Sequence, residues 1–381
     1  VKGISDLKDI SKFKNIGLRT IVIYVGTTVI AITIGLGLVN IVQPGNGISE
    51  ETITKLTETY ANSGGVQAKI AEASKQQSSG PLQFLVDMVP DNAIKAMGSN
   101  KSMLQVIFFT IFLGISMLLV GEERARPLKN FFDSLNEVVL KMVDIIMLSA
   151  PFAVFALLAS VVVSSNDPDL LLALLKYALT VVGGLLLLIG FYMVLISVFT
   201  KKNPLWFLKQ ISPAQLLAFS TSSSAATLPV TMERVEEHLG VDKEVSGFVL
   251  PVGATVNMDG TSLYQGIAAV FIMQVIWPEG LTFTNQLVIV ATALLASIGS
   301  AAVPSAGMVM LVIVLESIGF PAELLPIGLA LIFAVDRPLD MCRTVVNVTG
   351  DATVSMLVAK SLGKLGEPKV KEWDDNYDAV K

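Results

Sequence analysis

The sequence predicts an all-α, polytopic membrane protein, and three features support this fold class. Hydrophobic residues make up 52% of the 381 residues and charged residues only 15%, whereas about 25% of a soluble domain is charged. Several apolar runs are longer than the roughly 20 residues that a spanning helix requires. These runs are continuously apolar rather than alternating, which favours helices over a β-barrel.

The composition also excludes several classes of function. Cys342 is the only cysteine and His238 the only histidine. An intrachain disulfide is therefore impossible, and a histidine-based catalytic site or metal centre in the membrane is excluded. We expect no enzymatic activity, no cofactor and, because no dense basic run is present, no nucleic-acid partner.

Charged loops predict how the first half crosses the membrane. The spanning segments expected there are residues 20–42, 103–121, 131–163 and 170–200. Basic stretches at residues 1–19, 124–129 and 201–209 are separated by two crossings each, so they share one side, which their Lys and Arg content marks as cytoplasmic. The long polar loop at residues 46–80 is then extracellular, and the tail at 364–381 is cytoplasmic. We expect a multi-pass protein of the cell membrane.

The second half contains a repeated pattern of interrupted apolar segments. Residues 213–233 and 293–315 each consist of two short apolar pieces around small polar residues, which is typical of a re-entrant hairpin. A helix broken by polar residues follows each hairpin, at 245–273 with "NMDGT" and at 327–360 with "NVTGD". Such interruptions in corresponding halves indicate a transporter site, and the loop topology makes the two repeats inverted.

The most informative stretch is "DRPLDMCRTVVNVTGD", which lies between two apolar runs. Its residues Asp336, Asp340, Arg343, Asn347 and Asp351 follow a spacing of i, i+4, i+7, i+11 and i+15. They share one helix face over about 22 Å. Three carboxylates with one arginine can hold a zwitterion and cations, and the alternative is a buried ladder of ion pairs.

Two further groups supply oxygen atoms at membrane depth. In "NMDGT" the glycine, Gly260, predicts local unwinding that frees carbonyl oxygens beside Asp259, as an alkali cation requires. Tyr24, Thr27 and Thr28 form a hydroxyl cluster on the first helix, and such hydroxyls either bond to carbonyls of their own helix or ligate an ion. N–H groups at the hairpin tips favour a carboxylate.

The motifs "SSSAATLPVTM", "GATVNMDGTSLYQG", "ASIGSAAVPSAG" and "DMCRTVVNVTGD" resemble those of the dicarboxylate/amino acid:cation symporter family, the glutamate transporter homologues. The resemblance covers most of the chain and is strongest over residues 212–360. It implies a homotrimer working as an elevator. Residues 1–43 and 170–363 would form the transport domain, 44–169 the scaffold, and 364–381 the cytoplasmic tail.

The resemblance also implies a substrate site. Arg343 matches the arginine that pairs with a substrate's side-chain carboxylate, and Asp340 matches the acceptor for its amino group. The other matching positions are Thr344, Asn347, Ser223, Ser224, Thr261, Val303 and Gly307. Among these, Asn347 and Ser224 match groups on the α-carboxylate, and the backbone of Val303 and Gly307 matches the outer hairpin that closes over it.

The family implies Na⁺ as the coupling ion, held at three sites. The first would use Asp351, Asn347, Asn257 and the carbonyl of Gly253. The second would use carbonyls of Thr255, Ser297, Ile298 and Ser300, and Met258 is also assigned to the sodium ligands. The third would use Tyr24, Thr27, Thr28, Asn257 and Asp259.

The chain also departs from the family pattern. Two further spanning helices are expected before Val1, so the sequence is expected to be a partial chain. Ser222 and Met341 stand where some members carry an arginine, and Gln265 stands where potassium-coupled members carry a glutamate. The last difference favours sodium coupling without potassium antiport.

We therefore expect a Na⁺-driven symporter for L-aspartate or L-glutamate. A proton- or sodium-coupled symporter for C4-dicarboxylates or neutral amino acids is the alternative. A channel is disfavoured because two hairpins closing on one site indicate occlusion. An intramembrane serine hydrolase is disfavoured because no catalytic partner lies near the hairpin serines.

Overall fold

The computed structural model describes residues 10–47, 89–97, 103–147, 168–298 and 306–369, in which helices joined by short turns and loops are present and no strand is found. The α-helices are α2 Ile10–Val42, α6 Ala93–Met97, α7 Met103–Val120, α8 Glu122–Met147, α10 Pro168–Leu195, α11 Pro204–Thr221, α12 Ser224–Glu233, α13 Lys243–Val256, α14 Asp259–Ile276, α15 Phe283–Ile298, α16 Ala306–Ser317 and α17 Leu325–Ser361. Short π or 3₁₀ turns, η2 to η5, lie at Ile196–Thr200, Arg234–His238, Pro278–Gly280 and Ala322–Leu324. The predicted all-α class is confirmed for these residues.

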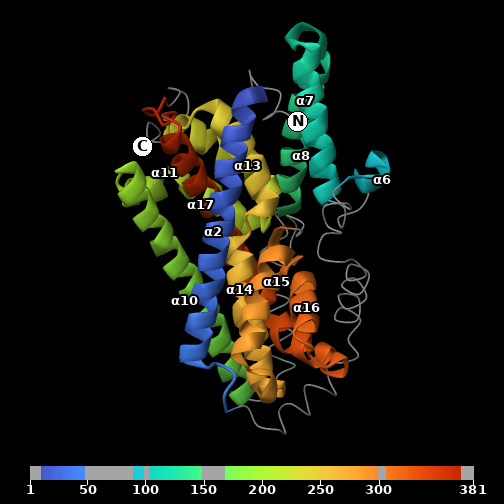
Figure 1. The fold of residues 1–381 in the computed structure, drawn as a ribbon, viewed down its shortest axis with the longest axis vertical. Coiled ribbons are helices and arrows are strands. Elements are labelled where there is room, and N and C mark those ends of the chain that lie inside the picture. Colours follow the sequence, from blue (N-terminus) through green and yellow to red (C-terminus); the bar gives the residue numbers. More distant parts are fainter. Residues whose placement is uncertain (1–9, 48–88, 98–102, 148–167, 299–305, 370–381) are drawn as a thin grey trace.

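The central helix of the fold is α14. Every residue from Asp259 to Val275 is buried, and α2, α10, α15, α16 and α17 pack around it. Figure 1 shows α2, α10 and α14 running side by side along the long axis. A helix that is enclosed on all sides can carry polar residues only where other helices supply partners.

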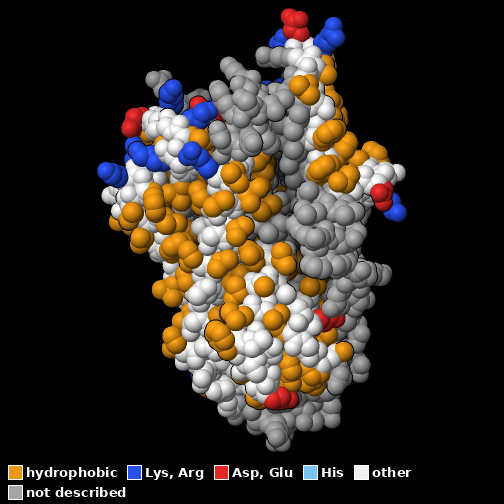
Figure 2. Space-filling view, in the orientation of Figure 1, with side chains coloured by type: hydrophobic (Ala, Val, Ile, Leu, Met, Phe, Trp, Pro, Cys, Tyr) orange, Lys and Arg blue, Asp and Glu red, His pale blue; other side chains and the backbone are white. Residues whose placement is uncertain are grey.

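The outer faces of the long helices are apolar. On α2 and α10, residues such as Leu18, Ile21, Leu179 and Leu186 are more exposed than buried, and Figure 2 shows hydrophobic side chains spread over this face between charged ends. Two helical segments among the described residues are long and apolar enough to cross a membrane, Ile16–Val42 and Leu172–Thr200. Exposed leucines here suit hydrocarbon rather than water.

The two predicted hairpins occupy opposite halves of the molecule. The first has arms α11 and α12, and the second has arms α15 and α16 (Figure 1). The first arm is longer than expected, because Asn203 caps a helix that begins at Pro204. The first tip is Ser222–Ser223, where Ser222 adopts a left-handed conformation with φ of 50°. The second tip, residues 299–305, lies outside the described residues.

One of the two predicted broken helices is broken, and the other is not. Non-helical torsions at Asn257 and Met258 separate α13 from α14, which confirms the break at "NMDGT". The prediction for residues 327–360 was wrong, since α17 is continuous. Its threonines Thr349 and Thr353 bond to carbonyls one turn back, and its other polar groups find partners on α17 itself or on neighbouring helices, so the helix stays closed.

The position of the unwinding at the first break also differs from the prediction. Gly260 is helical, and the chain opens instead at the two residues before Asp259. A methyl group on Gly260 would lie 2.7 Å from the carbonyl oxygen of Arg343. This glycine therefore permits close packing of α14 on α17 rather than a change in backbone conformation.

The basic segment at residues 124–129 was expected to be a loop, but it is the start of α8. Gly121, with φ of 96°, ends α7, and α8 begins directly after it. Glu122 and Glu123 suit the positive end of a helix dipole, which favours the earlier start. The helix expected at 131–163 therefore begins at Glu122, and its part after Met147 lies outside the described residues.

We predict that the contact between α2 and α14 depends on Gly35. A methyl group there would lie 2.7 Å from the carbonyl oxygen of Leu263, so Gly35→Ala should lower the stability by about 1–3 kcal/mol through overpacking. Gly37, on the same helix, has no neighbour within 4 Å of such a methyl group. In thermal unfolding of the purified protein in detergent, the melting temperature should fall for Gly35→Ala and stay unchanged for Gly37→Ala. Equal shifts in melting temperature for the two variants would contradict this packing.

Candidate functional site

The polar face predicted for the long helix lies in the interior of the protein. Asp336, Asp340, Arg343, Asn347 and Asp351 are all buried on α17. Because α17 stays helical through all five, the spacing brings them onto one side of a rigid element. The prediction of a common buried face is confirmed, and the groups that meet it decide between an ion-pair ladder and a binding site.

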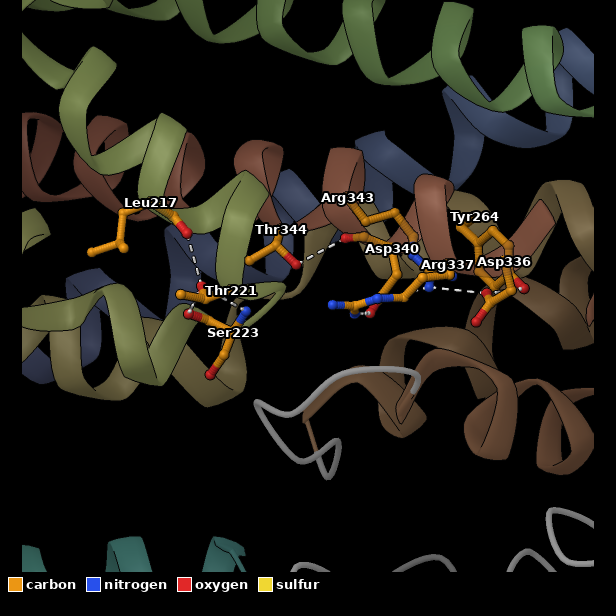
Figure 3. Close-up of polar contacts among 9 residues, drawn as sticks. All are labelled: Leu217, Thr221, Ser223, Tyr264, Asp336, Arg337, Asp340, Arg343 and Thr344. Atoms are coloured by element: carbon orange, nitrogen blue, oxygen red, sulfur yellow. Dashed lines mark hydrogen bonds and ion pairs between the residues drawn. The ribbon is translucent and has the colours of Figure 1, made fainter. Parts of the chain in front are cut away.

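Arg343 lies at the centre of this face with its side chain fully buried. Its Nη2 atom donates to Oδ1 of Asp336 at 3.0 Å and to Oδ1 of Asp340 at 2.7 Å (Figure 3). The guanidinium carbon lies 3.8 Å from the centroid of the Tyr264 ring, and the Tyr264 hydroxyl donates to Asp336 at 2.9 Å. Two carboxylates and an aromatic face thus hold one side of the guanidinium.

The other side of the same guanidinium is not paired. Nε and Nη1 of Arg343 are buried and have no hydrogen-bond partner in the described part of the chain. A methyl group on Gly307, in the first turn of α16, would lie 3.0 Å from Nη1, so these donors face the second hairpin. Buried donors of a cation without acceptors are costly, and an anionic group placed here would satisfy them.

Asp340 lies between two arginines beside the first hairpin. Its Oδ2 is 3.5 Å from Nη1 of Arg337, and its backbone carbonyl accepts from the Thr344 hydroxyl at 2.9 Å. Figure 3 shows Thr344 lying between Asp340 and the hairpin tip with Thr221 and Ser223. The structure thus brings the tip of one hairpin and an acid–base pair of α17 to the same place.

The first hairpin tip is formed by serine and threonine hydroxyls. The Ser223 hydroxyl caps α12 by accepting from the N–H of Ala226 at 3.2 Å, and the Ser223 N–H donates to Thr221 at 3.2 Å. Ser224 is buried as the first residue of α12. These contacts give the tip a fixed shape and place a helix N-terminus there, which suits a carboxylate.

A second polar cluster surrounds the break between α13 and α14. Asn257 donates to Asp351 at 2.9 Å, and its own Oδ1 is buried without a partner among the described residues. Asn347 accepts from the N–H of Gly260 at 2.8 Å and lies 3.4 Å from the Thr261 hydroxyl. The amide Oδ1 of Asn257 and the carboxylate of Asp351 therefore offer hard oxygen ligands in one place.

Gly253 completes this cluster. A methyl group on it would overlap both the Tyr24 hydroxyl and the Asp351 carboxylate, so three elements converge on this one glycine. The Tyr24 hydroxyl donates to the carbonyl of Val249 at 2.9 Å. Tyr24, Gly253 and Asp351 are thus close together, although the resemblance implies that Tyr24 belongs to a different sodium site from Gly253 and Asp351.

Asp259 is fully buried and receives only neutral donors. The Thr28 hydroxyl donates to its Oδ1 at 2.5 Å, and the Tyr192 hydroxyl donates to its Oδ2 at 2.6 Å. Thr27 and Thr28 also lie 3.1 and 2.8 Å from the carbonyl of Tyr24, which confirms the bonds to their own helix, whereas ion ligation by these hydroxyls stays a prediction. Within the described residues no Lys or Arg pairs with Asp259 or Asp351, whereas Asp336 and Asp340 have Arg343.

The second sodium set is described only in part. Thr255 is buried near the break, and its hydroxyl donates to the carbonyl of Val252 at 3.3 Å. The Ser297 hydroxyl donates to the carbonyl of Leu294, within α15, at 2.8 Å. Met258 is one of the two residues at the break, and Ile298 is the last residue of α15. Val303 and Ser300 lie outside the described residues.

Sequence reasoning missed Tyr192 and Tyr264 as members of these clusters. Tyr264 is within the quoted motif "GATVNMDGTSLYQG", and its spacing from Asp259 gave no indication that it would stack on Arg343. Tyr192 is the only strongly polar side chain in the run "LLLLIGFYMVL" of α10. A single hydroxyl in such an apolar run is the signal that could have identified it.

Comparison with known proteins identifies the family of the chain. A family model described as the sodium:dicarboxylate symporter family matches residues 1–361. The chain belongs to this family. Membership makes it a transporter and a multi-pass membrane protein, with helices rather than strands across the membrane.

Individual members of the sodium:dicarboxylate symporter family are similar over nearly the whole chain. Human excitatory amino acid transporter 5 is 34% identical over 94% of this chain and 72% of its own length. Mouse excitatory amino acid transporter 2 is 35% identical over 92% of this chain and 67% of its own. The proton/sodium-glutamate symport protein of Bacillus caldotenax is 32% identical over 98% of this chain and 85% of its own.

We predict that Gly253→Ala abolishes stabilisation of the protein by sodium. The added methyl group would displace the Tyr24 hydroxyl or the Asp351 carboxylate, which converge on this position. Gly190→Ala on α10 is the matched control, since no atom lies within 4 Å of its added methyl group. The melting temperature should rise on replacing choline chloride with NaCl for the parent protein and Gly190→Ala only; an undiminished rise for Gly253→Ala would contradict the site.

Proposed function

We propose that this protein is a secondary active transporter that couples the inward movement of Na⁺ to uptake of acidic amino acids, L-aspartate or L-glutamate. The observation that carries the proposal is the half-paired guanidinium of Arg343, whose Nε and Nη1 are buried without partners in the described residues. The relatives support it, because they are named excitatory amino acid transporters and sodium-glutamate symport proteins.

The charges beside Arg343 distinguish between classes of substrate. A side-chain carboxylate would satisfy the unpaired donors of Arg343, and an ammonium group would be accepted by Asp340, whose Oδ1 is 2.7 Å from that guanidinium. A C4-dicarboxylate has no ammonium group for Asp340, and a neutral amino acid leaves Arg343 unpaired at a cost of about 1–3 kcal/mol. An acidic amino acid meets both requirements.

The remaining substrate contacts would come from α17 and the two hairpins. We assign the α-carboxylate to Asn347 and to Ser224 at the N-terminus of α12, with Thr344, Ser223 and Thr261 beside it. The second hairpin would close over the substrate through Val303 and Gly307. Gly307 supports this role because its Cα faces Nη1 of Arg343 with no side chain between them.

Sodium would balance the buried carboxylates that have no basic partner. One proposed site consists of Asp351, Asn347, Asn257 and the Gly253 carbonyl. Another consists of Asp259, Asn257, Tyr24, Thr27 and Thr28. Thr255, Met258, Ser297, Ile298 and Ser300 are assigned to the third. Each Na⁺ moving down a tenfold gradient and 100 mV contributes about 1.4 and 2.3 kcal/mol respectively, so two or three ions support steep accumulation.

The mechanism proposed is alternating access by an elevator movement within a homotrimer. Residues 1–43 and 170–363 would move as the transport domain against a scaffold of residues 44–169, and the tail from residue 364 would be cytoplasmic. The dense packing of α2, α10, α15, α16 and α17 around α14, with α13 packed on α2 and α17, supports a single moving unit. The hairpins at opposite ends of this unit would be its two re-entrant gates.

The test is uptake of labelled L-aspartate into proteoliposomes with and without an inward Na⁺ gradient. We expect accumulation only with the gradient, because the buried carboxylates need cations before substrate binds. Equal uptake in both conditions would reject sodium coupling. Uptake driven by a proton gradient, or preference for succinate or alanine over aspartate, would favour the alternative symporters instead.

A substitution of Arg343 tests the substrate class. Arg343→Ala should weaken L-aspartate binding at least about tenfold while retaining binding of small neutral amino acids, because only the acidic side chain uses the guanidinium. Arg343→Lys should recover part of the loss, since it restores charge but not the planar fork. Arg126→Ala, which removes an exposed arginine of α8, is the control; aspartate transport at the parent level by Arg343→Ala would refute the assignment.

A further inference from the structure

We propose that Tyr192 on α10 is a positioning residue of the Asp259 cation site, and that its hydroxyl sets the sodium affinity of the transporter. The inference rests on the proposed sodium coupling and deepens it. Tyr192 is completely buried, and its hydroxyl donates to Oδ2 of Asp259 at 2.6 Å. Neither its neighbours in sequence nor the motif spacing indicated this contact.

Hydroxyl groups donate to both oxygens of the Asp259 carboxylate, and the Thr27 hydroxyl also lies close to it. Thr28 of α2 donates to Oδ1 at 2.5 Å and Tyr192 of α10 donates to Oδ2 at 2.6 Å. A carboxylate has about four lone-pair positions, so two hydroxyls fix its plane and leave the remaining lone pairs for a cation. Loss of either hydroxyl would leave a buried charged oxygen without its donor and free to rotate.

The Tyr192 hydroxyl also contacts the helix that carries Asp351. A methyl group on Gly350 would lie 2.8 Å from the Tyr192 hydroxyl and 3.0 Å from Nδ2 of Asn257. The glycine of "NVTGD" is therefore required for space rather than for unwinding, since the hydroxyl of α10 fits against it. One hydroxyl thus lies where α10, α14 and α17 meet, between the two carboxylates that have no basic partner.

Packing alone does not account for this tyrosine. Its ring lies among buried apolar residues, where a phenylalanine would fill the same space. Tyr177, on the same helix and equally buried, stacks on Phe271 with centroids 4.5 Å apart. Its hydroxyl has no hydrogen-bond partner among the described residues. The two tyrosines therefore provide a comparison between a hydroxyl that contacts the cation site and one that does not.

The experiment compares Tyr192→Phe with Tyr177→Phe in proteoliposomes. For Tyr192→Phe we expect the Na⁺ concentration for half-maximal L-aspartate uptake to rise about tenfold, as loss of a hydrogen bond to a charged group predicts. The apparent affinity for aspartate at saturating Na⁺ should stay within about twofold. Tyr177→Phe should match the parent protein in its Na⁺ dependence, and an unchanged Na⁺ dependence in Tyr192→Phe would overturn the inference.

A second readout separates positioning from a general loss of stability. The ratio of Na⁺ to Li⁺ concentrations that support half-maximal uptake should change in Tyr192→Phe, because a reoriented carboxylate alters the geometry that discriminates between ions. A lower melting temperature with an unchanged ratio and Na⁺ dependence would reduce Tyr192 to a structural role.

Thermal stabilisation by NaCl, measured without substrate, keeps this inference separate from the proposed transport of aspartate. If the parent protein responds to Na⁺ but transports no acidic amino acid, the proposed function fails. The role of Tyr192 is then tested by the Na⁺ concentration that gives half of the maximal thermal stabilisation. This concentration should be about tenfold higher in Tyr192→Phe than in the parent protein. If the parent protein shows no response to Na⁺ in either assay, both proposals are rejected.

Discussion

The rest of the structure depends on a surplus of buried negative charge. Asp259 and Asp351 lie in the protein interior, where their described partners are hydroxyl and amide groups rather than Lys or Arg. A carboxylate in such an environment is costly unless a positive charge joins it. This lack of basic partners is the physical basis for the proposal that sodium ions bind at the polar clusters on α13, α14 and α17.

The two buried polar clusters, proposed to bind substrate and ions, lie along one continuous helix, α17. Asp336, Asp340 and Arg343 form the end of the polar face that meets the second hairpin, while Asn347 and Asp351 meet the break between α13 and α14. An unbroken α17 fixes the distance between the two clusters. Asn347 accepts from the N–H of Gly260 and so joins α17 directly to the first turn of α14.

Glycine positions show how closely the helices must approach to build these clusters. Gly253, Gly260 and Gly350 each stand where a methyl group would overlap or crowd a polar group of the site. They are therefore responsible for bringing oxygen ligands from different helices to within bonding distance. This use differs from the expectation that glycine in a polar motif marks unwinding, and only Asn257 and Met258 leave the helical conformation.

The sequence by itself determined the helical class, the two hairpin regions and the polar face of α17, because hydrophobic run length and the 3.6-residue period are local properties. It also identified Asp340, Arg343 and Asp351, since charges in an apolar run need no structure to be recognised. The tertiary structure decided what meets those charges: the Tyr264 ring against Arg343, the Tyr192 hydroxyl on Asp259, and the continuity of α17. These contacts join residues far apart in the chain, and their distances depend on helix packing that no local pattern encodes.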